Sequence, residues 1–220
     1  MRLLLIRHGQ TPSNVQGLLD TAAPGPGLTV LGERQAAAVP TALADRDIDA
    51  IAVSPLVRTS FTAAPLAISR GLTPLTFDGL REVEAGDLEM ESHHAAHQRY
   101  LGTVFAWARG DVSLRMPGGP DGVEFLGRYD EAVAQIASSG RETVVAFSHG
   151  AAIRSWASAR VAGVDVDEVE HTSLQNTGMV EIDGDPTRGW ELVTWTSAPV
   201  GGLELASRAA EDPTGEAVDR

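Results

Sequence analysis

The first residues that could carry out chemistry are Arg7 and His8, which follow the apolar run 3–6 and precede Gly9. A short apolar run that ends at a glycine predicts a buried β-strand, so this charged pair lies where the strand leaves the core. Arginine offers a planar fork of donors that suits phosphate or carboxylate, and histidine can serve as a nucleophile, an acid, a base or a metal ligand. Taken alone, the pair could also do no more than end a strand, because a single short motif is weak support.

The same pattern returns later in the chain. The apolar run 143–147 leads to Ser148, His149 and Gly150, and a helix is expected directly afterwards. Arg58 stands in a comparable place, in the first turn of the helix expected after another apolar run. Ligands of open α/β sheets bind outside the carboxyl ends of the strands, where helix N-termini also attract anions. These segments therefore predict an anion site, although an arginine placed like Arg58 is more often simply solvated.

Carboxylates follow the short strand that is predicted at 75–77. Glu82 and Glu84 lie in the glycine-containing loop 80–89, and one of them could be a general acid. On charge alone, a solvated acidic loop is the simpler interpretation. Asn14, in the polar turn after the first strand, could donate its amide to an anion, but a helix cap is favoured on local grounds.

His93, His94 and His97 form a histidine cluster that could hold a metal ion. His93 and His97 have the i, i+4 spacing that can place two ligands on one helix face. No glutamate follows the first histidine as it does in zinc proteases, and no third ligand is evident. The sequence therefore favours a cluster without metal.

The composition is that of a globular protein with one sizeable core. The chain has 220 residues, of which 43% are hydrophobic and 21% are charged. It contains no cysteine, no signal-peptide pattern and no apolar run of membrane-spanning length, which fits a cytoplasmic protein. Its formal net charge of −13 argues against nucleic-acid and membrane-surface partners. All 17 fixed cations are arginines, so a small anionic substrate would need several of them gathered locally.

We expect one α/β domain over residues 1–198. A mostly parallel central sheet, with one antiparallel edge strand, lies between two layers of helices in a three-layer sandwich. Helices are predicted at 32–45, where Pro40 should kink or end the helix, and at 123–138. The runs 176–183 and 190–195 predict a hairpin, which should lie at the edge of the sheet.

Two segments do not belong to the predicted sheet and its covering helices. Residues from about 89 to 122 are expected to form a cap insert, which ends in the long glycine- and proline-rich loop 116–122. Aromatic residues in this insert could contact an apolar leaving group or simply pack the insert, which is their commoner fate. Residues 199–220 are expected to be a mobile C-terminal tail without catalytic residues.

In combination, these segments resemble the histidine phosphatase superfamily, also called the phosphoglycerate mutase-like family. The resemblance covers about residues 3 to 183 in five ordered blocks. The blocks are Arg7-His8-Gly9 with Thr11 and Asn14; Leu28-Thr29 with Gly32, Gln35 and Ala36; Ser54-Pro55-Leu56 with Arg58, Thr59, Thr62 and Ala63; Leu80 with Glu82, Gly86 and Glu89; and Ser148-His149-Gly150.

The resemblance implies a role for each matching residue. His8 is the nucleophile that becomes phosphohistidine, and Glu82, which has the family's spacing, is the proton donor to the leaving group. The groups that bind the phosphoryl group are then Arg7, Arg58 and His149, with a hydrogen bond from Asn14. Two arginines and a protonated His149 would supply the positive charge, so no metal or other cofactor is implied. His8 must be neutral to attack, and a backbone carbonyl such as that of Gly9 could orient it.

The same resemblance implies a metal-independent phosphatase that hydrolyses a small phosphomonoester, and it allows a homodimer. The chain has Leu88-Glu89-Met90 where the family often has Trp-Glu-Gly, and Gly118-Gly119-Pro120-Asp121 where it often has Gly-Gly-Glu-Ser. The second segment helps mutases handle their phosphorylated substrate, so its loss favours a phosphatase over a cofactor-dependent phosphoglycerate mutase. A catalytically silent phosphate-binding protein of the same fold is the third alternative. A proline- and glycine-rich insertion at 23–27 also alters a loop near the site.

Overall fold

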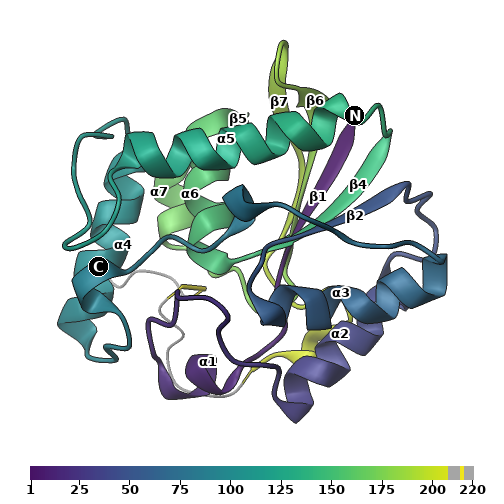
Figure 1. The fold of residues 1–220 in the computed structure, drawn as a ribbon, viewed down its shortest axis with the longest axis horizontal. Coiled ribbons are helices and arrows are strands. Elements are labelled where there is room, and N and C mark those ends of the chain that lie inside the picture. The colour runs from purple at the N-terminus through teal and green to yellow at the C-terminus, as the bar shows by residue number, and fades with distance from the viewer. Residues whose placement is uncertain (208–213, 216–220) are drawn as a thin grey trace.

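A computed structural model describes residues 1–207 and 214–215 (Figure 1). Seven strands form one sheet in the order β3-β2-β4-β1-β6-β7-β5. The strands are β1 (Arg2–Arg7), β2 (Ala50–Val53), β3 (Leu75–Thr76), β4 (Thr143–Ser148), β5 (Val161–Ala162), β6 (Met179–Asp185) and β7 (Gly189–Thr196). The α-helices are α1 (Pro12–Gln16), α2 (Val30–Ala42), α3 (Val57–Arg70), α4 (His94–Ala108), α5 (Gly122–Ser138), α6 (Gly150–Arg160) and α7 (Val166–Glu170).

The sheet is covered by helices on both faces, which confirms the expected three-layer arrangement (Figure 1). Successive side chains of a strand point to opposite faces, and β1 shows this directly. Leu4 and Ile6 pack with residues of α2 and α3 in one core cluster. Leu3 and Leu5 belong to the larger cluster on the other face, which includes residues of α4, α5 and α6. Because both faces of the sheet are buried at β1, the sequence of this strand is an unbroken apolar run.

The antiparallel strand does not lie at the edge of the sheet. β1, β4, β2 and β3 run parallel to one another, and β6 runs antiparallel to both β1 and β7. The expected hairpin is therefore present, but β7 covers the free side of β6. The short strand β5, formed by the two residues after α6, then pairs parallel with β7 and becomes the edge. The expectation of an antiparallel edge strand is wrong because β7 lies outside β6. The hairpin is not at the edge because β5, whose two residues have no strand pattern of their own, pairs with β7.

The helices lie close to their predicted ranges. The Thr29 side chain caps α2, so the helix begins at Val30, and it runs through Pro40 to end at Ala42. The inner face of α5 is formed as expected by Phe125, Leu126, Tyr129, Val133 and Ile136.

Residues 89–122 are built around α4, which packs against the main core. Tyr100, Phe105 and Trp107 are at most 1% exposed. The Tyr100 hydroxyl donates to the Val83 carbonyl at 2.8 Å, and Trp107 Nε1 donates to the Leu114 carbonyl at 2.7 Å. These aromatic side chains therefore pack the protein interior.

Part of the expected tail is held on the domain. The carbonyl of Leu205 accepts a hydrogen bond from Gln35 Nε2 at 2.8 Å, and Ser207 Oγ accepts one from Gln10 Nε2 at 2.8 Å. Thr214 is buried as well. The remaining tail, 208–213 and 216–220, lies outside the described residues, and its expected mobility stays a prediction.

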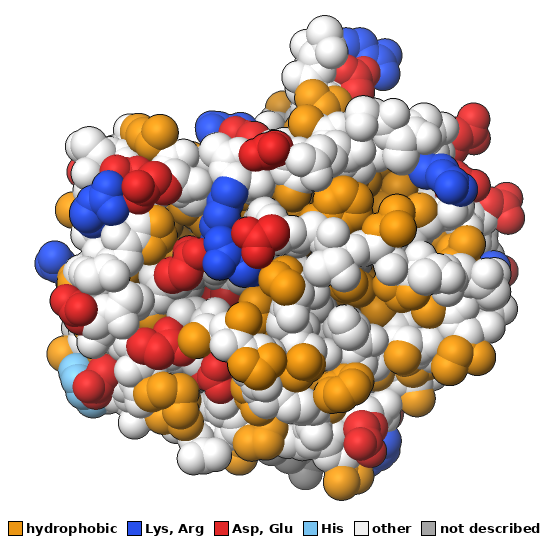
Figure 2. All heavy atoms as spheres, viewed as in Figure 1, with side chains coloured by type: hydrophobic (Ala, Val, Ile, Leu, Met, Phe, Trp, Pro, Cys, Tyr) orange, Lys and Arg blue, Asp and Glu red, His pale blue; other side chains and the backbone are white. Residues whose placement is uncertain are grey.

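The face of the molecule shown in Figure 2 carries charged side chains of both signs. On the face shown in Figure 2, arginine side chains are interspersed with acidic ones and form no large basic patch. None of the helices in the described part of the chain has the length and apolar character needed to cross a membrane.

Candidate active site

The carboxyl ends of three parallel strands meet at one edge of the sheet. The register aligns the last residues of β1 and β2 with the end of β4. His8, Ser54 and His149 follow these strands directly, so they leave the sheet side by side. The ring centroids of His8 and His149 are 5.2 Å apart. The structure thus brings together the two histidines that the sequence singled out, at the edge where α/β sheets bind ligands.

His8 is buried and held in one orientation. Its Nδ1 lies 2.8 Å from the carbonyl oxygen of Gly9. A carbonyl only accepts, so Nδ1 carries the proton and Nε2 keeps its lone pair. Burial lowers the pKa of His8 well below its ordinary value, and the charges of Arg58 and Arg7 lower it further. The imidazole is therefore neutral near pH 7 and has a nucleophilic Nε2.

Arg7 and Arg58 bring buried positive charge to the site, with exposed fractions of 1% and 3%. Arg58 Nη2 donates to the Asp20 carbonyl at 3.0 Å, and Nε donates to His149 Nδ1 at 3.3 Å. Its Nη1 is also buried and has no hydrogen-bond partner among the described residues. A buried donor without an acceptor is unfavourable, so this group indicates a place for an anion. The 23–27 loop lies close by, since a Cβ at Gly25 would be 2.5 Å from Arg58 Nη1.

His149 is neutral in this structure, contrary to the expectation that it is protonated. Arg58 Nε can only donate, so His149 Nδ1 accepts and the ring proton lies on Nε2. That proton is donated to Ser54 Oγ, at 2.7 Å. Burial and the charge of Arg58 lower the pKa of His149 well below its ordinary value. The positive charge of the site therefore comes from the arginines.

Glu82 lies at the N-terminus of α6. Its carboxylate accepts hydrogen bonds from the backbone N–H groups of Val83 at 2.9 Å, Ala152 at 2.8 Å and Ala151 at 3.3 Å. Burial nevertheless raises the pKa of Glu82 above its ordinary value, because the carboxyl group is 1% exposed. A carboxyl with a raised pKa is suited to donate a proton.

Glu84, the second choice for the acid, is directed elsewhere. Its carboxylate lies 3.1 Å from Arg128 and 3.2 Å from Arg81. The side chain does not line the cavity that Glu82 and His8 share.

Asn14 takes part in both roles considered for it. It is the third residue of α1, and its side chain completes a capping box with Thr11. Oδ1 accepts hydrogen bonds from the Thr11 backbone at 2.9 Å and from Asn176 Nδ2 at 3.3 Å. The amide nitrogen is thereby left as the end that can donate to a ligand, and Asn14 lines the cavity at His8.

The histidine cluster at residues 93–97 has structural partners. His93 caps α4 by accepting from the Ala96 N–H at 3.1 Å, and His97 Nε2 lies 2.9 Å from the Gly17 carbonyl. Among the described residues, no three His, Asp or Glu side chains form a group that could hold a metal ion.

Three buried residues at the site were missed by sequence reasoning. Asn176 Nδ2 donates to the His8 carbonyl at 3.1 Å. Arg154 lies on α6 and is fully buried, and it donates to the carbonyl of Val169 at 3.0 Å. Thr214 Oγ1 accepts a hydrogen bond from Arg7 Nη2 at 2.9 Å. Of these three residues, Arg154 alone could have been suspected from the sequence, because it lies one helical turn after Gly150. Nothing in the sequence near Thr214 indicates its contact with Arg7.

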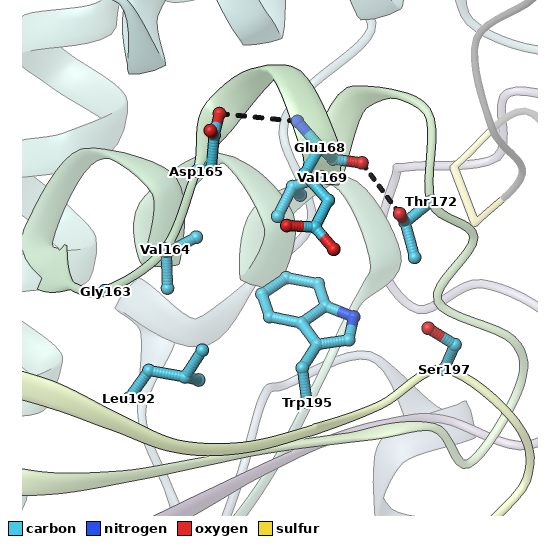
Figure 3. A pocket seen from close by; sticks show the side chains of 9 residues that line it. All are labelled: Gly163, Val164, Asp165, Glu168, Val169, Thr172, Leu192, Trp195 and Ser197. Carbon is cyan, nitrogen blue, oxygen red and sulfur yellow. Dashed lines mark hydrogen bonds between the residues drawn. The ribbon is translucent and has the colours of Figure 1, made fainter.

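The cavity at this cluster is small, and a larger one lies elsewhere. The cavity shared by His8, Arg58 and Glu82 measures about 10 Å³, whereas one of about 180 Å³ lies beside α7 and β7. In the larger cavity, the carboxylate of Glu168 faces the indole ring of Trp195 (Figure 3). Of the described residues that line it, none is an arginine or a histidine. The larger cavity therefore lacks both a cation and a strong nucleophile. We place the candidate active site at the smaller cavity because its side chains can bind and attack a phosphoryl group.

The chain is similar to proteins of one known family. Residues 3–198 match the histidine phosphatase superfamily (branch 1). The chain is 39% identical over 216 residues to the PE-PGRS family protein PE_PGRS11 of Mycobacterium tuberculosis (strain H37Rv); the match covers 91% of the chain but only 37% of that longer protein. It is 33% identical over 209 residues to the glucosyl-3-phosphoglycerate phosphatase of Mycobacterium tuberculosis (strain CDC 1551), covering 88% of the chain and 91% of the relative.

A solved structure gives the same result. A mycobacterial glucosyl-3-phosphoglycerate phosphatase in complex with VO3 superposes with a TM-score of 0.74 at 27% sequence identity, covering 90% of this chain and 99% of the other. The chain therefore belongs to the histidine phosphatase superfamily and is a phosphomonoesterase of that superfamily.

Proposed function

We propose that this protein hydrolyses a small phosphomonoester without a metal, through a phosphohistidine intermediate on His8. One observation carries the proposal: a neutral His8, oriented by the Gly9 carbonyl, lies among buried arginines, and Arg58 Nη1 has no acceptor in the described chain. A dianionic phosphoryl group would supply that acceptor.

The first step transfers the phosphoryl group to the protein. The Nε2 lone pair of His8 attacks phosphorus as the bond from phosphorus to the leaving oxygen breaks. Glu82 gives its proton to that oxygen, so the leaving group departs as a neutral alcohol. The products of this step are phosphohistidine and an ionised Glu82.

The second step restores the protein. The Glu82 carboxylate takes a proton from water as the water oxygen attacks phosphorus and the bond to His8 Nε2 breaks. Inorganic phosphate leaves, and both side chains return to their starting protonation states. One carboxyl thus alternates between acid and base, which a raised pKa allows.

The positive charge needed for phosphoryl transfer comes from Arg7 and Arg58. The chemistry asks the protein mainly for positioning and for stabilisation of charge on the phosphoryl oxygens. Charge-assisted hydrogen bonds from guanidinium groups give both. The named activity of the relative, on glucosyl-3-phosphoglycerate, supports a small phosphorylated metabolite as the substrate class.

The test compares the intact protein with His8→Ala in phosphate release from an aryl phosphate in the presence of EDTA. We expect release that EDTA leaves unchanged and that the variant loses. Rapid acid-free quenching and mass spectrometry should find a phosphoryl group on His8 in the intact protein. Equal activity of the variant would overturn the assignment of His8. Phosphate binding without turnover of any phosphomonoester would indicate the silent binder, and transfer between glycerate positions without release would indicate the mutase.

A further inference from the structure

The orientation of Arg58 depends on the loop that follows α1. The guanidinium is 3% exposed and donates through Nη2 to the Asp20 carbonyl at 3.0 Å. The bond from Nε to His149 Nδ1, at 3.3 Å, is longer than most hydrogen bonds of an N–H group. Because Nη1 has no acceptor in the described chain, the Asp20 carbonyl is the group that chiefly sets the direction of the guanidinium. A residue that fixes Asp20 therefore also fixes the donors that would bind phosphate.

Glu89 anchors this loop at the two residues that follow Asp20. Its Oε1 accepts from the backbone N–H of Thr21 at 2.8 Å and from that of Ala22 at 3.0 Å. Its Oε2 accepts from the Thr21 hydroxyl, and Thr21 Oγ1 in turn accepts from the Ala85 N–H at 3.0 Å. The bonds to the carboxylate are charge-assisted and therefore strong. One side chain thus holds the loop directly beside the carbonyl that orients Arg58.

The backbone around Glu89 supports the same loop. The Leu19 N–H donates to the Glu91 carbonyl at 3.0 Å, and the Leu19 carbonyl accepts from the Met90 N–H at 2.9 Å. Met90 has a φ of 64°, a left-handed conformation that residues other than glycine adopt mainly where their surroundings impose it. The segment 85–91 is therefore shaped to hold the loop at residues 19–22.

We propose that Glu89 is a positioning residue of the phosphate site, which acts through the Asp20 carbonyl on Arg58. The inference rests on the phosphate site proposed above but not on turnover. Glu89 is not among the residues that line the cavity at His8. Its negative charge would repel a phosphate, so its contribution must come from its hydrogen bonds and not from its charge.

Two substitutions separate the hydrogen bonds from the charge. Glu89→Gln removes the charge, but its amide oxygen can still accept from Thr21 and Ala22, and its NH2 can donate to Thr21 Oγ1. Glu89→Ala removes all of these contacts. Thr21→Val, which removes only the hydroxyl, is the milder variant in case Glu89→Ala disturbs folding. Glu91→Ala is the matched control, because that exposed carboxylate lies 3.3 Å from His93 Nε2 and not on the loop.

The readout is the Kd for inorganic phosphate from titration calorimetry, with thermal unfolding to show that each variant is folded. We expect Glu89→Ala to bind phosphate about tenfold more weakly than the parent, and Thr21→Val to lie between the two. Glu89→Gln should bind at least as tightly as the parent, and Glu91→Ala should match the parent.

A double-mutant cycle shows whether Glu89 acts through Arg58. In an Arg58→Lys protein, the guanidinium that Glu89 positions is absent. Adding Glu89→Ala to that protein should therefore change the Kd by less than about twofold. A general structural effect of Glu89→Ala would instead weaken binding equally in both backgrounds.

The remaining outcomes overturn the inference. Unchanged binding in folded Glu89→Ala would show that the anchor does not set the site, and Thr21→Val decides this point in the same way if Glu89→Ala does not fold. Equal losses with Arg58 and with lysine at position 58 would show that Glu89 does not act through the guanidinium. A loss in Glu89→Gln as large as that in Glu89→Ala would assign the effect to the charge. A parent that does not bind phosphate removes the proposed phosphate site as well, whereas normal binding by the parent and by Glu89→Ala removes this inference alone.

Discussion

Replacing Glu82 by glutamine removes the proposed proton donor while keeping most of its contacts. The Oε1 atom accepts from the backbone N–H groups of Val83 at 2.9 Å and Ala152 at 2.8 Å, and an amide oxygen can accept both. The bond of 3.3 Å from Ala151 to Oε2 is lost, because an amide NH2 cannot accept it. We therefore expect Glu82→Gln to fold, with the free energy of unfolding lower by about 1–3 kcal/mol.

The expected kinetic effect depends on the leaving group. General-acid catalysis contributes about 10²–10⁴-fold, which is about 3–5 kcal/mol of the activation barrier. An alkyl phosphate has a poor leaving group and should lose this whole factor in kcat/KM, which reports the reaction up to the departure of the leaving group. An aryl phosphate with an acidic phenol leaves without much help, so its loss in the first step should stay below about tenfold.

The pH profile gives a second, independent readout. Burial raises the pKa of Glu82, and the protonated form is the one that donates. In the parent, kcat/KM for an alkyl phosphate should therefore fall as the pH rises through this raised pKa, and the variant should lack that decline. Glu84→Gln is the control, since that carboxylate is paired with Arg128 outside the cavity. Equal losses of kcat/KM on both substrates, or a decline that persists in Glu82→Gln, would refute the reasoning.

Three further predictions concern the arginine and histidine framework. Arg58→Lys keeps the positive charge but loses the planar set of guanidinium donors, so calorimetry should show phosphate binding that is about 10–100-fold weaker. An unchanged Kd would contradict the role of Arg58. Ser54→Ala leaves the buried Nε2–H of His149 without its acceptor, which costs about 1–3 kcal/mol and should lower Tm by about 2–10 °C; an unchanged Tm in calorimetric unfolding would be contrary to this. The depressed pKa of His149 means that its contribution to stability is present above the unfolded pKa of about 6.5 and is lost as the pH falls towards the folded pKa. In denaturant titrations at successive pH values, the free energy of unfolding of the parent should therefore fall by about 1.4 kcal/mol per pH unit relative to that of His149→Gln in that window. The same dependence of the free energy of unfolding on pH in both proteins would refute the depressed pKa.

Local patterns in the chain predict most of the fold and the polar ends of its strands. The runs that became β1 and β4 are unbroken because helices cover both faces of the sheet, and that burial makes each strand visible from its own residues. The polar residues that end them, Arg7 and His8 on one strand and His149 on the other, follow directly. The strand β5 could not be predicted in the same way, because its two residues have no strand pattern of their own and form a strand by pairing with β7.

Local sequence patterns therefore predict which reactive groups the chain carries and at which edge of the sheet they lie. The tertiary structure decided the states of those groups. It places Glu82, and not Glu84, in the cavity with His8 and against the N-terminus of α6. It also buries His149 beside Arg58, which lowers the pKa of that histidine. It also brought Thr214 to Arg7 across 207 residues of chain. Protonation states and contacts of this kind depend on the burial and charge that distant segments impose, so no local pattern encodes them.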